Sequence, residues 1–253
     1  MIWNADPVLI SFSVVRIHWY GVLFVSALFI GARIMKGLYA EEGLPEASLD
    51  ALFVYCVVGI IVGARLGHCI FYDPGYYLNN VLKIFAIWEG GLASHGGGIG
   101  VIIAVFFYTR KYRVKPLWLL DRLALPTALF GSAVRIGNFM NSEILGTPSN
   151  LPWAVTFLRV DNVPRHPVQL YESLVYFLVF IALSAACRFS RIKEWPGRLF
   201  GVFLCAVFSA RFLLEFVKVE QAAYTGFFFT TGQMLSIPFL AAGIWLLVWP
   251  KTE

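Results

Sequence analysis

Seven long apolar stretches separate short polar segments, and they limit the possible folds more than any other feature of the chain. Each has close to the ~20 residues with which an α-helix crosses the hydrocarbon core of a bilayer. Backbone polar groups must pair within such a segment, because lipid offers them no partner. The sequence therefore predicts an all-α polytopic membrane protein, with residues 1–253 forming one integral membrane domain. The expected spans are 18–38, 51–71, 92–110, 118–139, 169–187, 198–217 and 233–250.

The composition agrees with a membrane location. Hydrophobic residues make up 59% of the chain and charged residues 14%, whereas soluble domains are about a quarter charged. The first residues have no basic region and no small-residue cleavage site, so no cleavable signal peptide is expected. The four cysteines lie in apolar segments without metal-site or disulfide spacing, and we interpret them as small buried hydrophobic residues.

The basic residues indicate the orientation. With the N-terminus outside, twelve Lys and Arg residues fall in the inner loops and tail and five in the outer segments. Inner loops carry the basic excess, so we expect a periplasmic N-terminus and a cytoplasmic C-terminus. The same loops account for the net charge of +5, and no nucleic-acid partner is expected.

The longest outer segment, 140–167, joins the fourth and fifth spans. Four prolines make it too structured in composition for a plain linker, and it is long for a connector. Its residues 153–157 have the composition of a short strand. We expect a small head insertion on the periplasmic face.

A glycine-rich stretch, 88–100, precedes the apolar part of the third span and contains His95. Glycine allows close approach of the backbone to a ligand, and it equally allows close packing of two membrane helices. Both interpretations remain open from the stretch alone. His95 favours a functional site, because a titratable group at the end of a span is usually functional and histidine can accept a proton near neutral pH.

Several polar side chains lie where lipid would exclude them. Arg135 and Asn138 share one helix face, and Asn141, Glu143 and Gly146 follow where the helix ends. A guanidinium with amide neighbours suits phosphate recognition. The simpler alternative, an arginine reaching out to the interface, does not explain the clustered Asn and Glu.

Further polar groups occur on other spans. Arg211, Glu215 and Lys218 form one stripe on the sixth span, in which Glu215 could orient Arg211. Gln169 and Glu172 share a face of the fifth span, and Tyr20 lies just inside the first. His18 and Trp19 fit an interfacial aromatic belt better. Arg65 is a further intramembrane charge, flanked by Gly63 and Gly67. Together these groups predict an outward-facing cavity that holds an anionic head group and a candidate base.

The chain resembles the phosphatidylglycerol–prolipoprotein diacylglyceryl transferase family in the order and spacing of these residues, from Ile17 to about Ser236. The resemblance rests on four blocks, which are 90–97, 135–141 with Glu143 and Gly146, 166–172 and 211–215. It implies a seven-span enzyme of the bacterial inner membrane. The family transfers the diacylglyceryl group of phosphatidylglycerol to the lipobox cysteine thiol of a prolipoprotein. The products are a thioether and glycerol 1-phosphate, and no metal or organic cofactor is used.

The resemblance also assigns roles to residues of this chain. His95, Arg211 and Glu215 match catalytic positions, and Arg135 matches the phosphatidylglycerol-binding arginine. The substrate-binding set is completed by Tyr20, Asn138, Glu143 and Gly146 from the resemblance and by Asn141 from its place in the cluster. Two positions depart from many members, which have Arg where this chain has Lys218 and Tyr where it has Val207. Lysine supplies a charge without the bidentate fork, so the role of position 218 is open.

The expected chemistry agrees with these residues. A thiol must lose its proton to become a nucleophile, and His95 is a reasonable base for that step. Arg135 and Arg211 could stabilise the charge of the leaving phosphate monoester in a low-dielectric pocket. The alternatives are a transporter or binding protein for a small anion or phospholipid, and a scaffold. The odd number of spans without an inverted repeat disfavours a transporter, and a scaffold would not need three intramembrane arginines.

Overall fold

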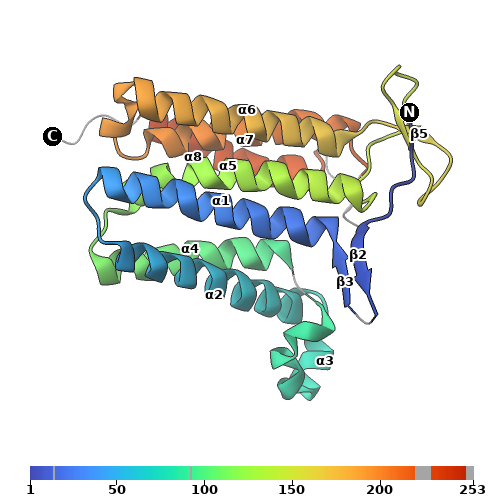
Figure 1. Cartoon of the computed structure of the whole chain (residues 1–253), viewed down its shortest axis with the longest axis horizontal. Helices are drawn as coiled ribbons and strands as arrows, with labels where there is room; N and C mark the ends of the chain where they lie inside the picture. Colours follow the sequence, from blue (N-terminus) through green and yellow to red (C-terminus); the bar gives the residue numbers. More distant parts are fainter. Residues whose placement is uncertain (14, 92, 220–228, 249–253) are drawn as a thin grey trace. The chain divides into compact units, whose positions relative to one another are not determined.

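The computed structural model describes residues 1–13, 15–91, 93–219 and 229–248, and within them the side chains of Val15, Glu89, Ser94, His95 and Lys193 are not described. Long helices dominate the described chain (Figure 1). They are α1 Trp19–Glu41, α2 Glu46–Phe71, α4 Ser94–Tyr112, α5 Pro116–Met140, α6 Val168–Phe189, α7 Arg198–Leu214 and α8 Thr231–Val248. Each overlaps one of the predicted spans. Short helices also occur, which are α3 Pro74–Asn79, η1 Val81–Phe85, η2 Ile87–Glu89, η3 Arg191–Glu194 and η4 Glu215–Val217.

Six of the long helices are long and apolar enough to cross a membrane: α1, α2, α5, α6, α7 extended to Val217, and α8. The chain is therefore an all-α polytopic membrane protein, as predicted. Helix α4, the seventh, has 19 residues and is not among these six. Glycines fill its first turns, which lowers their apolarity, and two basic residues lie in its last turn. Pro126 lies inside α5, and the helix continues past it.

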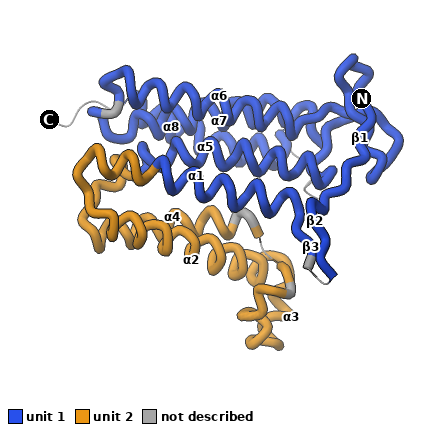
Figure 2. Tube along the Cα trace, in the orientation of Figure 1, with its two compact units in different colours: residues 1–34, 120–253 blue, residues 35–119 orange. Residues whose placement is uncertain are grey.

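The chain divides into two compact units, which are coloured in Figure 2. Unit 1 contains residues 1–34 and 120–253, and unit 2 contains residues 35–119. The boundaries fall inside α1 and α5, so each of these helices contributes to both units. His95 belongs to unit 2, whereas Arg135, Glu172 and Arg211 belong to unit 1.

In unit 1, helices α5, α6, α7 and α8 run lengthwise beside one another together with most of α1 (Figure 1). Polar side chains join α5 to α6, because the Ser132 and Ser173 hydroxyls lie 2.9 Å apart and the Ser173 hydroxyl also donates to the Ser132 carbonyl. Small residues let α7 and α8 approach closely, and a Cβ at Gly243 would lie 3.0 Å from the Gly201 carbonyl oxygen. Such contacts are typical of membrane helix pairs.

Short strands gather at one end of unit 1. Strand β1 (Ile2–Trp3) pairs in parallel with β4 (Val155–Phe157), which pairs antiparallel with β5 (Pro164–Arg165). The strand predicted within 153–157 is therefore present. Phe139, at the end of α5, packs with Val155 and Phe157, and Trp3 covers this small core. A separate hairpin, β2 (Val8–Phe12) and β3 (Val15–His18), leads into α1.

An ion pair fixes the loop before β5. The Arg165 guanidinium contacts the Asp161 carboxylate at 2.6 Å and also donates to the Gly146 carbonyl oxygen. Hydrogen bonds from Arg165 hold the pKa of Asp161 below its usual range. Arg165 thereby ties the loop to the turn that follows α5.

A buried carboxylate from another helix lies at the N-terminal end of α7, and sequence reasoning missed it. Asp121 of α5, with no exposed surface, accepts hydrogen bonds from the backbone N–H groups of Gly197 at 2.7 Å and Phe200 at 2.8 Å. These groups belong to the first turn of α7, where four N–H groups lack partners within the helix. Asp121 is therefore the N-terminal cap of α7, supplied by another helix.

In unit 2, α2 and α4 pack through glycines on both helices. A Cβ at Gly63 would lie 2.8 Å from the Gly100 Cα atom, and a Cβ at Gly67 would lie 2.7 Å from the Gly96 Cα atom. These distances leave no room for a side chain, so the helices meet backbone to backbone. The packing interpretation of the glycine-rich stretch is thus confirmed for Gly96 and Gly100.

Candidate functional site

Charged side chains from α5, α6 and η4 meet in unit 1 and alternate in sign. The Arg135 Nε atom lies 2.8 Å from Oε2 of Glu172, and Lys218 Nζ lies 3.5 Å from Oε1 of the same carboxylate. Lys218 Nζ also lies 3.9 Å from Glu215 Oε2. The Glu172 side chain is 1% exposed. A carboxylate buried to this degree needs paired charges, and Arg135 and Lys218 supply them.

Lys218 directly follows Val217, the last residue of the candidate span. Burial lowers the pKa of its ammonium group from the ordinary value, and the Glu172 carboxylate acts in the opposite direction. Position 218, where the resemblance left the role open, thus bridges Glu172 on α6 and Glu215 on η4. A single ammonium point charge can make both contacts without a planar fork.

Hydrogen bonds continue the cluster toward the turn after α5. Arg135 Nη1 donates to Asn138 Oδ1 at 3.2 Å, as their shared helix face predicts. The Asn138 amide donates to Glu143 Oε1 at 2.8 Å, and the Asn141 amide donates to the same oxygen at 3.2 Å. The structure therefore joins four predicted site residues, Arg135, Asn138, Asn141 and Glu143, in one network. Among the residues with described side chains, amide groups rather than a cation bind the Glu143 carboxylate.

The turn that presents Glu143 has an unusual backbone. Ser142 and Ile144, on either side of Glu143, have φ angles of 55° and 58°, a region that β-branched residues rarely occupy. The buried Gln169 side chain donates from Nε2 to the Glu143 carbonyl oxygen at 2.7 Å. Such strain persists where the surroundings over-determine the conformation, and it is frequent at functional sites.

Two further predicted residues pack close to this network. A Cβ at Gly137 would lie 2.6 Å from the Tyr20 ring, so this glycine makes room for Tyr20. The Tyr20 hydroxyl lies within electrostatic reach of Glu143 and Arg135. A Cβ at Gly146 would lie 2.7 Å from the His166 Cβ and clash with its backbone. Close chain packing accounts for this glycine, and its role in substrate binding stays a prediction.

Arg211 and Glu215 do not form the pair that their spacing suggested. Glu215 contacts Lys218, and among the residues that the structure describes no hydrogen bond or ion pair engages the Arg211 guanidinium. Arg211 still lies within electrostatic reach of Tyr176 and Lys218, so it belongs to the same cluster. The expected orienting role of Glu215 toward Arg211 is therefore not what the contacts show.

The site prediction for His95 falls in unit 2. His95 is the second residue of α4, and its side chain lies outside the described part of the structure. The preceding turn contains Gly90 and Gly91, with φ angles of 87° and 70°. Their carbonyl oxygens both accept hydrogen bonds from Arg65 Nη1.

Arg65 contributes to this turn and not to an anion site. Its guanidinium also donates to the carbonyl oxygens of Lys83 and Ile84, and the side chain lies over the Tyr77 ring. Backbone carbonyls thus occupy Nε, Nη1 and Nη2 of a residue that is 4% exposed. The contacts do not support the expectation that Arg65 lines the head-group cavity, because four of its five N–H donors bind backbone carbonyls.

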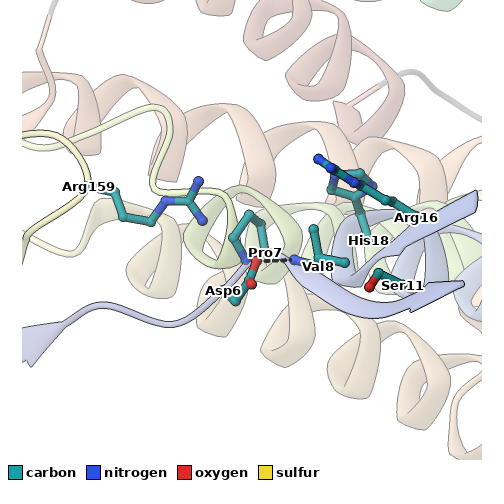
Figure 3. Close-up of a pocket in the computed structure, with 7 residues that line it drawn as sticks. All are labelled: Asp6, Pro7, Val8, Ser11, Arg16, His18 and Arg159. Atoms are coloured by element: carbon teal, nitrogen blue, oxygen red, sulfur yellow. Dashed lines mark hydrogen bonds between the residues drawn. The ribbon is translucent and has the colours of Figure 1, made fainter. Parts of the chain in front are cut away.

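A cavity of about 410 Å³ lies elsewhere in unit 1, between the N-terminal hairpin and the loop after β4 (Figure 3). It is lined by Asp6, Pro7, Val8, Ser11, Arg16, His18 and Arg159. None of the predicted site residues lines it. Within the described ranges, no group of three or more His, Cys, Asp or Glu residues could hold a metal ion.

Sequence reasoning placed Gln169 and Glu172 on one face and among the groups of the predicted cavity, but gave neither a catalytic or substrate-binding role. The structure makes Glu172 the partner of Arg135 and Lys218, and Gln169 the anchor of the Glu143 turn. The available signal was a carboxylate inside a span, which is costly unless paired. Three arginines and one lysine lie in or beside the spans, so the partner of the Glu172 carboxylate could not be chosen from sequence spacing alone.

Comparison with known proteins shows the family of the chain. Residues 7–249 match the family described as prolipoprotein diacylglyceryl transferase. The chain is 50% identical to a phosphatidylglycerol–prolipoprotein diacylglyceryl transferase of Tolumonas auensis, with 100% of this chain and 98% of the relative covered. Relatives of the same name from Chloroherpeton thalassium and Porphyromonas gingivalis are 46% and 44% identical, each over 97% of this chain and over 92% and 93% of the relative. The chain therefore belongs to the prolipoprotein diacylglyceryl transferase family.

Proposed function

We propose that this protein transfers the diacylglyceryl group of phosphatidylglycerol to the lipobox cysteine thiol of prolipoproteins, the first step of lipoprotein maturation. Full-length similarity to relatives that carry this activity in their names supports the proposal. The single structural observation that carries it is the buried Arg135–Glu172–Lys218–Glu215 chain with Arg211 beside it. A guanidinium that no described residue pairs, within a membrane protein, suits a phosphate head group.

The reaction exchanges one bond for another. The cysteine sulfur forms a bond to the terminal glyceryl carbon as the bond from that carbon to the phosphate oxygen breaks. Glycerol 1-phosphate leaves, the acyl chains stay in lipid, and the thiol proton passes to a base. Arg135 and Arg211 would stabilise the charge that develops on the phosphate.

The remaining predicted residues take roles around that step. The phosphatidylglycerol-binding residues would be Tyr20, Asn138, Asn141, Glu143 and Gly146. Their network with Arg135 supports this assignment, because hydrogen bonds fix the guanidinium before a ligand arrives. Glu215 would be a catalytic residue of the same cluster as Arg211, with Lys218 rather than Arg211 as its ionic contact.

We also propose His95 as the base that accepts the thiol proton. Its place near the start of α4, after a turn clamped by Arg65, supports the assignment. His95→Asn should lose most transfer, and raised pH should restore part of the rate because more of the peptide thiol is then thiolate. Phosphatidylglycerol binding should be unchanged. A loss of lipid binding without rescue at high pH would make His95 a structural or head-group residue.

The cellular setting follows from the same proposal. We infer that the protein lies in the bacterial inner membrane with its N-terminus in the periplasm, its C-terminus in the cytoplasm and the 140–167 segment as a periplasmic head. The basic residues of the loops support this orientation. The substrates also require it, because a lipobox cysteine must meet a phospholipid head group at the outer leaflet.

The activity can be tested directly. Purified full-length protein in phosphatidylglycerol vesicles should convert a lipobox peptide to its thioether-linked diacylglyceryl form, detected by mass, and should release glycerol 1-phosphate in equal amount. A matched peptide with serine in place of the cysteine should stay unmodified. Absence of product with a correctly folded protein would refute the proposed function.

A further inference from the structure

The first turn of α8 lies against the Glu215 carboxylate. A Cβ at Gly232 would fall 2.6 Å from Glu215 Oε2 and closer still to Cδ and Oε1. Real Cβ atoms do not approach other atoms to this distance. The carboxylate can therefore occupy its position only because residue 232 is glycine.

A capping box builds this end of α8. The Thr230 N–H group donates to Gln233 Oε1 at 3.1 Å, and the Gln233 N–H group donates back to Thr230 Oγ1 at 3.3 Å. This reciprocal pattern fixes the start of a helix. The Gln233 side chain also donates from Nε2 to the Phe212 carbonyl oxygen at 3.4 Å, which connects the box to α7 next to Arg211.

The electrostatic setting favours a carboxylate at this place. The N-terminal end of a helix carries the positive end of its dipole and stabilises a nearby negative charge. Lys218 Nζ lies 3.9 Å from the same carboxylate. The α8 end and Lys218 thus favour the Glu215 carboxylate at this place. Arg211 lies four residues earlier in the chain, a spacing at which oppositely charged helix side chains can also pair.

We infer that Gly232, fixed by the Thr230–Gln233 capping box, is a positioning residue that holds Glu215 away from Arg211 and so leaves the Arg211 guanidinium available to the phosphate of phosphatidylglycerol. The inference rests on the proposed function. Within the described residues the Arg211 guanidinium has no ion pair, although the Glu215 carboxylate follows only four residues later in the chain. Diverting Glu215 accounts for this unpaired charge.

The test compares two glycines of α8. Gly232→Ala forces the carboxylate out of its position, and Glu215 then competes for Arg211. Gly243→Ala is the packing control on the same helix, because its Cβ would lie 2.8 Å from Cys205 Sγ and 3.0 Å from the Gly201 carbonyl oxygen, both on α7, and would meet no charged group. The measurement is equilibrium binding of a fluorescent short-chain phosphatidylglycerol to the detergent-purified full-length protein.

We expect Gly232→Ala to weaken lipid binding on the order of tenfold, because only the fraction of molecules with a free Arg211 can bind. Gly243→Ala should lower the melting temperature without weakening binding. In the Glu215→Gln background the effect of Gly232→Ala should largely vanish, since an uncharged side chain does not compete for the guanidinium. If Gly232→Ala fails to fold, Gln233→Met, which removes the capping box without adding a Cβ at 232, should weaken binding in the same direction.

Other outcomes would overturn the inference. Equal binding by the Gly232→Ala and wild-type proteins would show that Gly232 serves packing alone, as would equal losses in both glycine variants. A loss that persists unchanged in the Glu215→Gln background would place the effect outside the Arg211–Glu215 competition. Failure of the proposed function is distinguishable, because the wild-type protein would then give no thioether product whatever the variants bind.

Discussion

At the scale of single residues, Glu172 joins two cations of the candidate site. It contacts Arg135 of α5 on one oxygen and Lys218 on the other, and its side chain is almost fully buried. Removing one member of such a group leaves uncompensated charge in a low-dielectric setting. The balance of charges, rather than any single pair, therefore stabilises this part of the molecule.

The balance gives a testable consequence for Glu172. Glu172→Gln should destabilise the protein by about 3–5 kcal/mol, because Arg135 then loses its carboxylate and Lys218 loses the nearer of its two carboxylates. Adding Lys218→Met should recover part of that loss by removing one cation. Unfolding in mixed micelles measures both variants. A double variant less stable than Glu172→Gln alone would contradict the charge-balance account.

Arg135 gives the second residue-scale prediction. Its Nε atom contacts Glu172 and its Nη1 atom donates to Asn138, so two nitrogen atoms of the guanidinium bind two different residues. Arg135→Lys keeps the charge but cannot make both contacts. Transfer should fall by about two to three decades, equivalent to roughly 2–4 kcal/mol of transition-state stabilisation, with the fold retained. Near-normal kcat/KM in the thioether assay would remove Arg135 from the site.

At the scale of elements, helix ends are completed by residues from other parts of the chain. Asp121 of α5 caps α7, and Gln169 of α6 anchors the turn after α5. In unit 2, Arg65 of α2 donates hydrogen bonds to carbonyl oxygens of the segment before α4. These polar contacts fix helix ends that apolar packing alone would leave free to shift.

The cap on α7 predicts an effect on stability that is separate from activity. Asp121→Ala should cost about 1–2 kcal/mol of unfolding free energy, because two backbone N–H groups lose their acceptor. Asp121→Asn, which keeps one acceptor, should cost less. The kcat of the folded fraction should stay normal, because Asp121 precedes Arg135 by 14 residues of helix, or roughly 21 Å at 1.5 Å per residue. A stable Asp121→Ala protein would show that water replaces the cap.

At the scale of the whole molecule, the basic residues of the loops decide how the chain enters the membrane. A reporter fused after Lys251 should show a cytoplasmic location, and one inserted near Asn162 a periplasmic location. The opposite pair of signals would reverse the orientation and move the charged cluster to the wrong leaflet for the proposed substrates. Substituted-cysteine labelling at Asn162 in intact cells provides an independent measurement.

The sequence by itself determined the helices and the family. Apolar stretches of membrane length form helices because lipid leaves no other partner for the backbone, and all seven predicted spans overlap long helices. Residues three apart, such as Arg135 and Asn138, share a face because that spacing is local. The strand within 153–157 could be predicted because the composition of a short segment is also a local property.

Tertiary structure alone decided the partners of the charges. Spacing suggested that Arg211 pairs with Glu215 and that Arg65 faces a ligand, yet Glu215 lies against α8 and Lys218, and Arg65 binds backbone carbonyls. Glu172 meets Arg135 although 37 residues separate them in the sequence. Charges act over several ångströms in low dielectric and take whichever neighbour the packing brings closest, and that neighbour comes from distant parts of the chain.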